Sequence, residues 1–175
     1  GMKERTFTLN GMSKTYSMTG WRLGYIAGPA ELIAMVNRVH QYCMVCAPSF
    51  VQAAGIAALR DEKDEVEAMV REYDRRRKYA VSAINAVPGI RCVCPKGAFY
   101  LMAALPVDDA DKFQMWLLNE FNDRGETVLF ACGEPFYATP GRGRNEVRLA
   151  YTINADDISR AIDILKIAIE AYNAR

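Results

Sequence analysis

The chain has 175 residues, of which 51% are hydrophobic and 25% are charged, with a formal net charge of +1. This is ordinary globular composition, enough for one domain or for a small domain with part of another. The near-neutral charge argues against a nucleic acid or an acidic membrane as a partner held by bulk electrostatics. No apolar run approaches the ~20 residues of a membrane span, G-M-K-E-R is not a signal peptide, and the five cysteines are scattered. We therefore expect a soluble, cytoplasmic protein with no membrane partner.

Two short apolar runs open the chain, Thr6–Leu9 and Leu23–Ala27, and their Gly, Asn and Pro boundaries are typical of short buried strands. The polar loop between them contains Lys14, and Arg22 follows eight positions later. If this loop is tucked into a cleft, a desolvated amine beside a cation loses its proton more readily and becomes a nucleophile toward aldehydes. Arg22 would supply the cation and a planar fork for a phosphate. An amine and a phosphate fork suit pyridoxal phosphate, whereas spacing alone leaves an ordinary surface loop as the alternative.

The stretch S-K-T-Y-S-M-T-G-W-R-L-G-Y begins at Ser13 and resembles the lysine motif of fold-type-I pyridoxal-phosphate aminotransferases, the class I/II relatives of aspartate aminotransferase. The resemblance implies that Lys14 is catalytic and forms the internal aldimine with pyridoxal 5'-phosphate. It also implies that Arg22 holds the cofactor phosphate and that Ser13 occupies the family's serine before the lysine. One departure is visible, because Gly11 stands where some members have a phosphate-binding serine. The implied reaction moves an amino group between an amino acid and a 2-oxo acid.

Three helices are expected next. Apolar residues at three- and four-residue spacing predict an amphipathic helix after Pro29, ended by the Ala47-Pro48 step: Leu32, Met35, Val36, Val39, Cys43 and Cys46. An alanine-rich helix follows at about 49–59, and a long helix with an acidic first turn spans 61–87. The basic run Arg75–Lys78 wraps round this last helix among acids, which favours a solvated surface over a nucleic-acid site.

The remaining pattern predicts strands at 90–93 and 98–102, a helix at 109–123, strands at 127–131 and 146–151, and a helix at 155–173. Asn154 or Asp156 is the expected N-cap of this last helix. From residue 61 onward this order indicates a compact α+β unit with helices on a small sheet. It resembles the small C-terminal domain of the same aminotransferases, and the resemblance covers essentially the whole chain. The implied division is a remnant of the large cofactor-binding domain at 1–60 and the small domain at 61–175.

Two segments of this second part carry the resemblance. K-G-A-F-Y-L is similar to the family's strand near the substrate, and G-R-N-E-V-R-L-A-Y is similar to the segment whose arginine grips the substrate α-carboxylate. The latter implies substrate binding by Arg148. An arginine near a strand end can meet a carboxylate with two parallel hydrogen bonds, although by itself a surface charge is the more usual interpretation. Arg142 and Arg144 are not assigned.

Cys43, Cys46, Cys92 and Cys94 would supply the four thiolates of a structural zinc site. The first pair falls on the apolar face of the predicted helix and the second on one side of a predicted strand, where free cysteine behaves as a small hydrophobe. We expect no metal site. The sole histidine, His40, lies in a helical stretch without a partner cluster, which favours a structural role.

Only thirteen residues precede Lys14, and two short strands cannot form a parallel sheet covered on both faces. In the family, the phosphate-binding loop, the acid for the pyridinium nitrogen and the stacking aromatic lie before the lysine. The expectation is therefore the C-terminal part of an aminotransferase, inactive or nearly so by itself. The identity of the amino acid cannot be inferred.

Apolar surface around Met35, Val39 and Val51 is expected to favour a homo-oligomer, most simply a dimer. Two alternatives of other classes stay open. One is a pyridoxal-phosphate-dependent lyase or synthase on the same scaffold. The other is a non-catalytic, folded small domain that self-associates.

Overall fold

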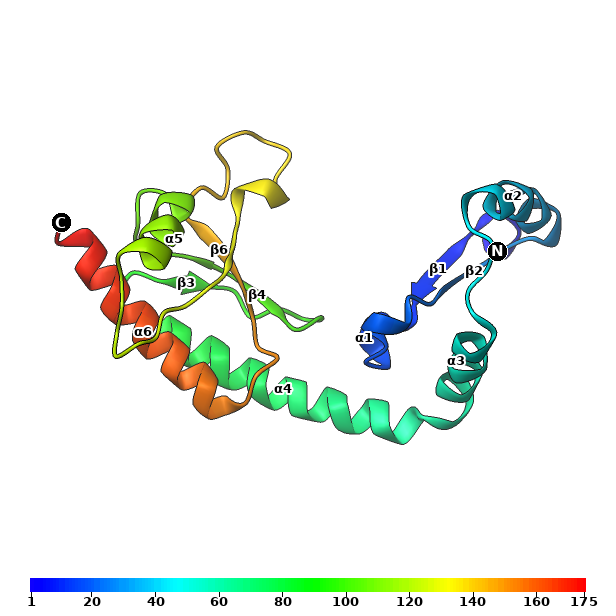
Figure 1. Ribbon diagram of the computed structural model, residues 1–175, viewed down its shortest axis with the longest axis horizontal. Coiled ribbons are helices and arrows are strands. Elements are labelled where there is room, and N and C mark those ends of the chain that lie inside the picture. The colour runs from blue at the N-terminus through cyan, green and yellow to red at the C-terminus, as the bar shows by residue number, and fades with distance from the viewer. The chain divides into compact units, whose positions relative to one another are not determined.

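A computed structural model describes all 175 residues, which form two compact units, Gly1–Met69 and Val70–Arg175. Figure 1 shows the elements of each unit. No helix combines the length and the apolar character that crossing a lipid bilayer requires.

The first unit begins with an antiparallel pair, β1 (Thr8–Gly11) and β2 (Gly24–Ala27), in which Gly11 lies opposite Gly24. A short helix, α1 (Met12–Thr15), follows β1 directly. Both predicted strands are therefore present, but the prediction that they are buried is wrong, since every residue of the two strands is exposed. A two-stranded ribbon buries little apolar surface unless another layer packs against it.

Helix α2 (Ala30–Cys43) has the predicted apolar stripe, yet none of its residues is buried. It ends earlier than predicted, because Met44 has an extended backbone and its N–H donates to the carbonyl of His40 at 2.8 Å. Cys46 therefore lies beyond the helix. Cys43 and Cys46 are both exposed, and the prediction that both lie on the apolar face of the helix is wrong for Cys46.

Helix α3 (Ser49–Asp61) follows Pro48 and provides most of the packing in this unit. Val51, which we expected on an exposed apolar surface, is only 3% exposed, and that prediction is wrong. The packing is close at Gly55, where an added Cβ would lie 2.4 Å from Cδ2 of Leu23. Ala58 lies in one small cluster with Met12 and Met18. The small residues of α3 therefore let it approach the loop that precedes β2.

The second unit contains a four-stranded antiparallel sheet in the order β3-β4-β6-β5. Its strands are β3 (Arg91–Cys92), β4 (Tyr100–Ala104), β5 (Ala131–Cys132) and β6 (Glu146–Ala150). The helices are α5 (Ala110–Asn119), α6 (Ala155–Asn173) and the part of α4 (Lys63–Asn85) from Val70 on. Helices α4 and α6 lie along the sheet in Figure 1. This mixture of helices and sheet confirms the predicted α+β class.

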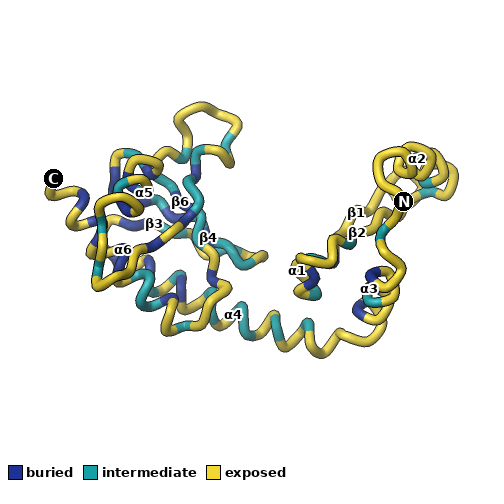
Figure 2. The backbone as a smooth tube through the Cα atoms, viewed as in Figure 1, coloured by how far each residue is buried: buried dark blue, intermediate teal, exposed yellow.

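The core of this unit follows from strand alternation. Leu101 and Ala103 of β4 and Val147 of β6 are buried, and the residues between them face outward. They belong to one cluster with residues of all three helices, among them Ile84, Phe113 and Leu165. Figure 2 shows buried residues gathered on these elements.

Most element boundaries of this unit differ from the prediction by about two residues, and two elements differ by more. The strand expected at 127–131 is reduced to Ala131–Cys132, which pair with Arg148 and Val147. In this register Leu129 would lie opposite Ala150, the last residue of β6. Residues 127 and 128 would therefore have no strand beside them. The helix expected at 109–123 begins after its N-cap Asp109 and already ends at Asn119.

The last helix has the predicted bounds, and its N-cap is Asn154, whose Oδ1 accepts the N–H of Asp157 at 2.8 Å. The basic run on α4 is solvated only in part. Arg76 and Arg77 are half-buried and donate to the carbonyls of Thr152 and Pro95. The prediction of a solvated surface therefore fails for these two arginines.

Candidate functional site

The loop around Lys14 is built on buried methionines. Met12 is 2% exposed and Met18 is 7% exposed. These buried side chains anchor the two ends of the segment from Met12 to Met18. The N–H of Met12 donates to the carbonyl of Leu23 at 3.0 Å, which continues the β1–β2 pairing by one residue. Between these anchors, α1 leaves Lys14 exposed and Ser13 half-buried. Within its own unit the lysine therefore lies on a fixed turn at the surface and not in a cleft.

Thr19 connects the predicted cofactor residues. Its Oγ1 donates to the carbonyl of Ser13 at 3.0 Å, and its own carbonyl accepts from Nη1 of Arg22, also at 3.0 Å. Sequence reasoning gave Thr19 no role, and its position between two polar residues carries no distinctive signal. The structure thus brings Ser13, Lys14 and Arg22 together on one short loop.

Arg22 has a left-handed backbone conformation, with φ 55°, and so has Ser17, with φ 54°. Residues other than glycine are uncommon in this region, because the left-handed conformation costs each of them roughly 1 kcal/mol. Such strain persists where the surroundings hold the chain in place, and it is frequent at functional loops. The hydrogen bond to Thr19 uses one of the five N–H donors of the guanidinium. It orients the arginine and leaves other donors for a ligand.

Arg148 belongs to the second unit and lies on β6 between two neighbouring strands. Met102 of β4 is its partner on one side and Ala131 of β5 on the other. Since Val147 is buried in the core, alternation places Arg148 on the opposite face of the sheet. There its guanidinium carbon lies 4.4 Å from the ring centre of Tyr100 and 4.7 Å from that of Phe136.

The other arginines near this strand have protein partners. Arg144 donates from Nε to Oδ2 of Asp109 at 2.9 Å, and Arg142 lies over the ring of Tyr137 at 5.1 Å. Arg148 makes no ion pair, and its guanidinium lies over the two rings. A half-buried guanidinium without a carboxylate partner is suited to receiving an anion. Of the two aromatic contacts, Tyr100 could have been found from K-G-A-F-Y-L, whereas nothing in the sequence pointed to Phe136.

The cysteines are divided between the units. Cys43 and Cys46 are exposed in the first, whereas in the second Cys92 is half-buried and Cys94 is exposed. Burial raises the pKa of the Cys92 thiol. No three His, Cys, Asp or Glu side chains are grouped so as to hold a metal ion.

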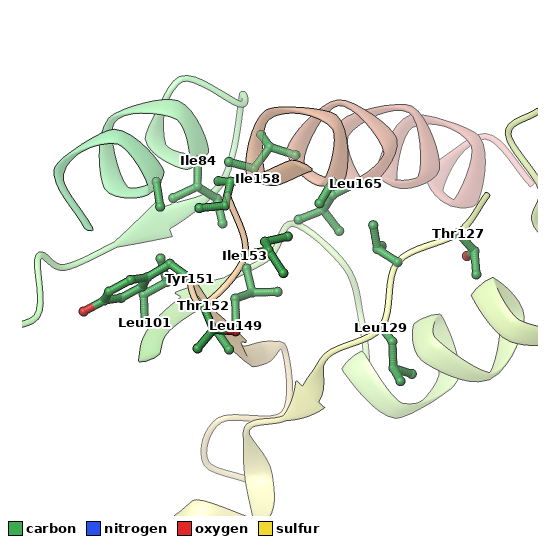
Figure 3. Close-up of a pocket in the computed structure, with 15 residues that line it drawn as sticks. Ile84, Leu101, Thr127, Leu129, Leu149, Tyr151, Thr152, Ile153, Ile158 and Leu165 are labelled. Carbon is green, nitrogen blue, oxygen red and sulfur yellow. The ribbon is translucent and has the colours of Figure 1, made fainter. Parts of the chain in front are cut away.

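A cavity of about 390 Å³ lies in the second unit, beside the segment Thr127–Leu129 and the connection from β6 to α6. Figure 3 shows aliphatic side chains such as Ile84, Ile158 and Leu165 around it. Its titratable side chain, Tyr151, donates its hydroxyl to the carbonyl of Ala98 at 2.8 Å. The cavity contains none of the predicted site residues, and its polar side chains are the hydroxyls of Thr127, Tyr151 and Thr152.

A family model and several known proteins match this chain. The family model described as "Aminotransferase class I and II" matches residues 1–165. The chain belongs to this family.

Two curated aminotransferases illustrate the relationship. The aspartate aminotransferase of Musicola paradisiaca is 37% identical over 180 residues, which cover 99% of this chain and 42% of that protein. The aspartate aminotransferase of Pyrococcus horikoshii is 37% identical over 172 residues, covering 95% of this chain and 42% of that protein. The chain therefore spans about two fifths of the length of these aminotransferases, consistent with the expected part of a longer enzyme.

Solved aminotransferases share the fold. The crystal structure of the aromatic aminotransferase from Pyrococcus horikoshii OT3 matches with a TM-score of 0.82 and 35% identity, over 99% of this chain and 45% of that chain. The aspartate aminotransferase from Rhizobium meliloti matches with a TM-score of 0.80 and 31% identity, over 96% and 42% of the respective chains.

Proposed function

We propose that this chain is part of a pyridoxal-phosphate-dependent aminotransferase that transfers an amino group between an amino acid and a 2-oxo acid. The observation that carries the proposal is the loop on which Thr19 links Ser13 to Arg22 beside Lys14. In a member of the class I and II aminotransferase family, an amine and a guanidinium on one fixed loop support cofactor binding.

The side chains of this loop fit pyridoxal phosphate in their chemistry. The amine of Lys14 is the group that would hold an aldehyde, and Arg22, with Ser13, would bind the phosphate. Gly11 offers no side-chain donor, so the phosphate has one contact fewer than in members with a serine there. When bound, the cofactor supplies an electron sink that stabilises negative charge at the substrate's Cα.

The reaction assigns two further tasks to this chain. Nζ of Lys14, once free as an amine, would take the proton from the substrate's Cα as a general base and then, as a general acid, deliver it to the cofactor's C4′. The guanidinium of Arg148 binds the α-carboxylate with two parallel hydrogen bonds. Fixing the carboxylate orients the Cα–H bond for this proton transfer.

We assign residues 1–60 to the remnant of the cofactor domain and 61–175 to the small domain, and we place the enzyme in the cytoplasm as a dimer. The division into two compact units near this boundary supports the first assignment. The exposed apolar stripe of α2 supports association with a second chain, since Met35 is 63% and Val39 is 65% exposed.

The cofactor assignment is tested with the chain itself. The chain is mixed with pyridoxal phosphate, reduced with borohydride and mapped by peptide mass spectrometry. We expect a pyridoxyl group on Lys14 at low cofactor concentration, and its loss in Lys14→Ala. Lys63→Ala is the matched control, because Lys63 is 84% exposed and pairs only with Glu67 in its own helix at 3.8 Å.

Equal, weak labelling of many lysines in the parent chain and in Lys14→Ala would contradict the proposal. In the complete enzyme, normal half-transamination by Lys14→Ala would contradict the role of Lys14 in proton transfer. Loss of labelling at Lys14 in Arg22→Gln, but not in Arg142→Gln, is expected if Arg22 binds the phosphate.

A second candidate function is a non-catalytic module that self-associates. It is favoured by the exposed apolar side chains of α2, including Tyr42 at 85% exposure. Sedimentation velocity separates the possibilities. We expect dimers or larger species that dissociate in the Met35→Lys/Val39→Lys double variant, and a strictly monomeric parent chain would contradict self-association in both proposals.

A further inference from the structure

Arg148 is held in an unusual way for a half-buried cation. Its guanidinium carbon lies within 5 Å of two ring centres, 4.4 Å for Tyr100 and 4.7 Å for Phe136, and no carboxylate pairs with it. Cation–π contacts of this kind stabilise a guanidinium by roughly 0.5–2 kcal/mol, more when it is desolvated. The two aromatic contacts thus replace the ion pair that usually accompanies a partly buried arginine.

The ring of Phe136 is placed by a short, well-tied turn. The N–H of Gly133 donates to the carbonyl of Glu146 at 2.7 Å, and the N–H of Phe136 donates back to the carbonyl of Gly133 at 3.0 Å. An added Cβ on Gly133 would lie 2.7 Å from that same carbonyl oxygen of Glu146, so only glycine lets the turn come this close to β6. Phe136 is nevertheless 52% exposed, which makes simple core packing a poor reason for its position.

Tyr100 reaches Arg148 through the register of the sheet. It pairs with Ala150, two residues beyond Arg148 on the same face of β6, which makes it a diagonal neighbour within reach of a long side chain. Its ring is itself packed against Phe99, with the ring centres 4.7 Å apart. The ring of Tyr100 is therefore held by Phe99, and the backbone of Phe136 is held by the turn at Gly133.

The one acidic residue beside Arg148 on this face is already engaged. Glu146 lies two residues earlier on β6, and its Oε2 accepts the hydroxyl of Tyr137 at 2.6 Å. This carboxylate raises the pKa of Tyr137, so the phenol keeps its proton for the hydrogen bond. No ion pair joins Glu146 to Arg148. The cation is left for an anion from outside the unit.

From these contacts we propose that Tyr100 and Phe136 are positioning residues for Arg148. The guanidinium carbon lies over both rings, and no hydrogen bond or ion pair joins its N–H groups to a protein acceptor, so these donors remain for a carboxylate. Preorganisation of this kind reduces the side-chain entropy that carboxylate binding would otherwise cost. The proposal rests on the proposed function for the identity of the ligand, the substrate α-carboxylate, and adds what orients its arginine.

The test uses the whole chain, with ¹⁵N in its arginine side chains, and observes the Nε–H of Arg148 by NMR. Arg148→Lys removes this resonance and so assigns it. We expect an upfield ring-current shift in the parent chain. In a titration with acetate against chloride at constant ionic strength, this resonance should move with acetate and not with chloride.

Removing either ring should weaken both signatures. In Tyr100→Leu and Phe136→Leu we expect part of the upfield shift to be lost and acetate binding to weaken by roughly 3- to 30-fold. Tyr100→Phe and Phe136→Tyr are the matched controls, which keep a ring and should keep the binding. They also keep the test informative if a leucine variant does not fold, as judged by circular dichroism.

An Arg148 resonance at an ordinary shift in the parent chain would overturn the proposal, and so would acetate binding that is unchanged after loss of either ring. These outcomes are independent of the cofactor. If Lys14 is not labelled by pyridoxal phosphate but Arg148 still binds acetate in a ring-dependent way, the proposed function fails and the positioning role stands. If Lys14 is labelled but acetate binding does not depend on the rings, the proposed function stands and the positioning role fails.

Discussion

The two units of this chain treat apolar residues differently. In Val70–Arg175, 21 buried hydrophobic residues form a single cluster beneath the sheet, whereas in Gly1–Met69 a cluster holds only Met12, Met18 and Ala58. Helix starts follow the same division. Helices α5 and α6 are capped by the side chains of Asp109 and Asn154, while α2 and α3 begin after prolines without a side-chain cap.

The difference teaches that element formation and burial are separate requirements. Both units form the helices that their periodicity predicts, but only the second stacks helices on a sheet so that apolar faces meet. The first unit exposes its stripe on α2, and few buried contacts mean low resistance to local opening. The loop of Lys14 therefore lies on the less stable unit, and Arg148 lies on the more stable one.

The largest difference between the two units is expected in unfolding free energy, when one phenylalanine in each unit is truncated to alanine. Phe113 is fully buried, with its ring 5.0 Å from Tyr172, so Phe113→Ala should cost about 3–5 kcal/mol of unfolding free energy. Phe50 is 68% exposed, and Phe50→Ala should cost less than about 1 kcal/mol. Urea unfolding followed by tryptophan fluorescence measures both, with Trp21 and Trp116 as reporters of the two units.

Equal losses from the two substitutions would show that the first unit has a core of its own. A large loss of unfolding free energy in Phe50→Ala, seen only in the fluorescence of Trp21, would lead to the same conclusion. The rings of Trp21 and Phe50 lie 6.3 Å apart.

Cysteine reactivity sharpens the comparison. Burial, with the nearby carboxylates of Asp111 and Asp109, raises the pKa of Cys132 to about 12, so few of its thiols are ionised at neutral pH. Cys43 and Cys46 are exposed. At about pH 8, iodoacetamide should modify Cys132 at least about a hundredfold more slowly than Cys43 or Cys46. Mass spectrometry of timed samples measures the rates, and urea should abolish the difference.

A smaller effect is expected from the cap of α6. Asn154→Ala removes the acceptor for the N–H of Asp157 and should cost about 1 kcal/mol. Asn154→Asp keeps an oxygen acceptor at the same place and should retain most of the stability in the same thermal or urea unfolding assay. If both variants lose equally, Asn154 stabilises the helix start by some means other than its side-chain oxygen.

The smallest effect concerns pH. Hydrogen bonds from Arg75 and Arg76 lower the pKa of Glu72 to about 2, below the usual glutamate value of about 4.3. Charged Glu72 therefore adds stability above about pH 4.3, and the contribution is lost as the pH falls toward 2. Glu72→Gln should make unfolding slightly less pH-dependent in that window, with Glu170→Gln as the surface control. Solvent screening keeps the effect small, and an unchanged pH profile would mean that these surface pairs do not stabilise the fold.

The local signals of the sequence were sufficient for much of the fold. The helix at 155–173 was predicted with its bounds, and its cap Asn154 was one of two candidates, because the cap and the aliphatic stripe act within a few residues of each other. The strand at 127–131 was not. The register leaves residues 127 and 128 beyond the end of β6 at Ala150, while Leu129 and Phe130 lie outside β5 although β6 extends beside them. Helix α2 was predicted correctly as a helix, but its end was placed too late, at the Ala47-Pro48 step instead of Cys43.

The same distinction holds for the candidate site. Lys14, Ser13 and Arg22 lie within ten residues of one another, so a motif could place them on one loop, but Thr19 was identified only from its hydrogen bonds. Arg148 could be selected from its segment. Its two aromatic contacts depend on a strand register and on a turn near Gly133, and no local sequence pattern predicts either of them.

By itself the sequence determined the order and type of most elements, the family, and the residues that carry an amine and two guanidiniums. These follow from spacing, caps and motifs that act over a few residues. Only the tertiary structure decided which apolar faces are buried, which arginines already have partners and which rings lie against Arg148. Burial and pairing depend on surfaces that meet from distant parts of the chain, and the free energy of such contacts is a property of the assembled layers.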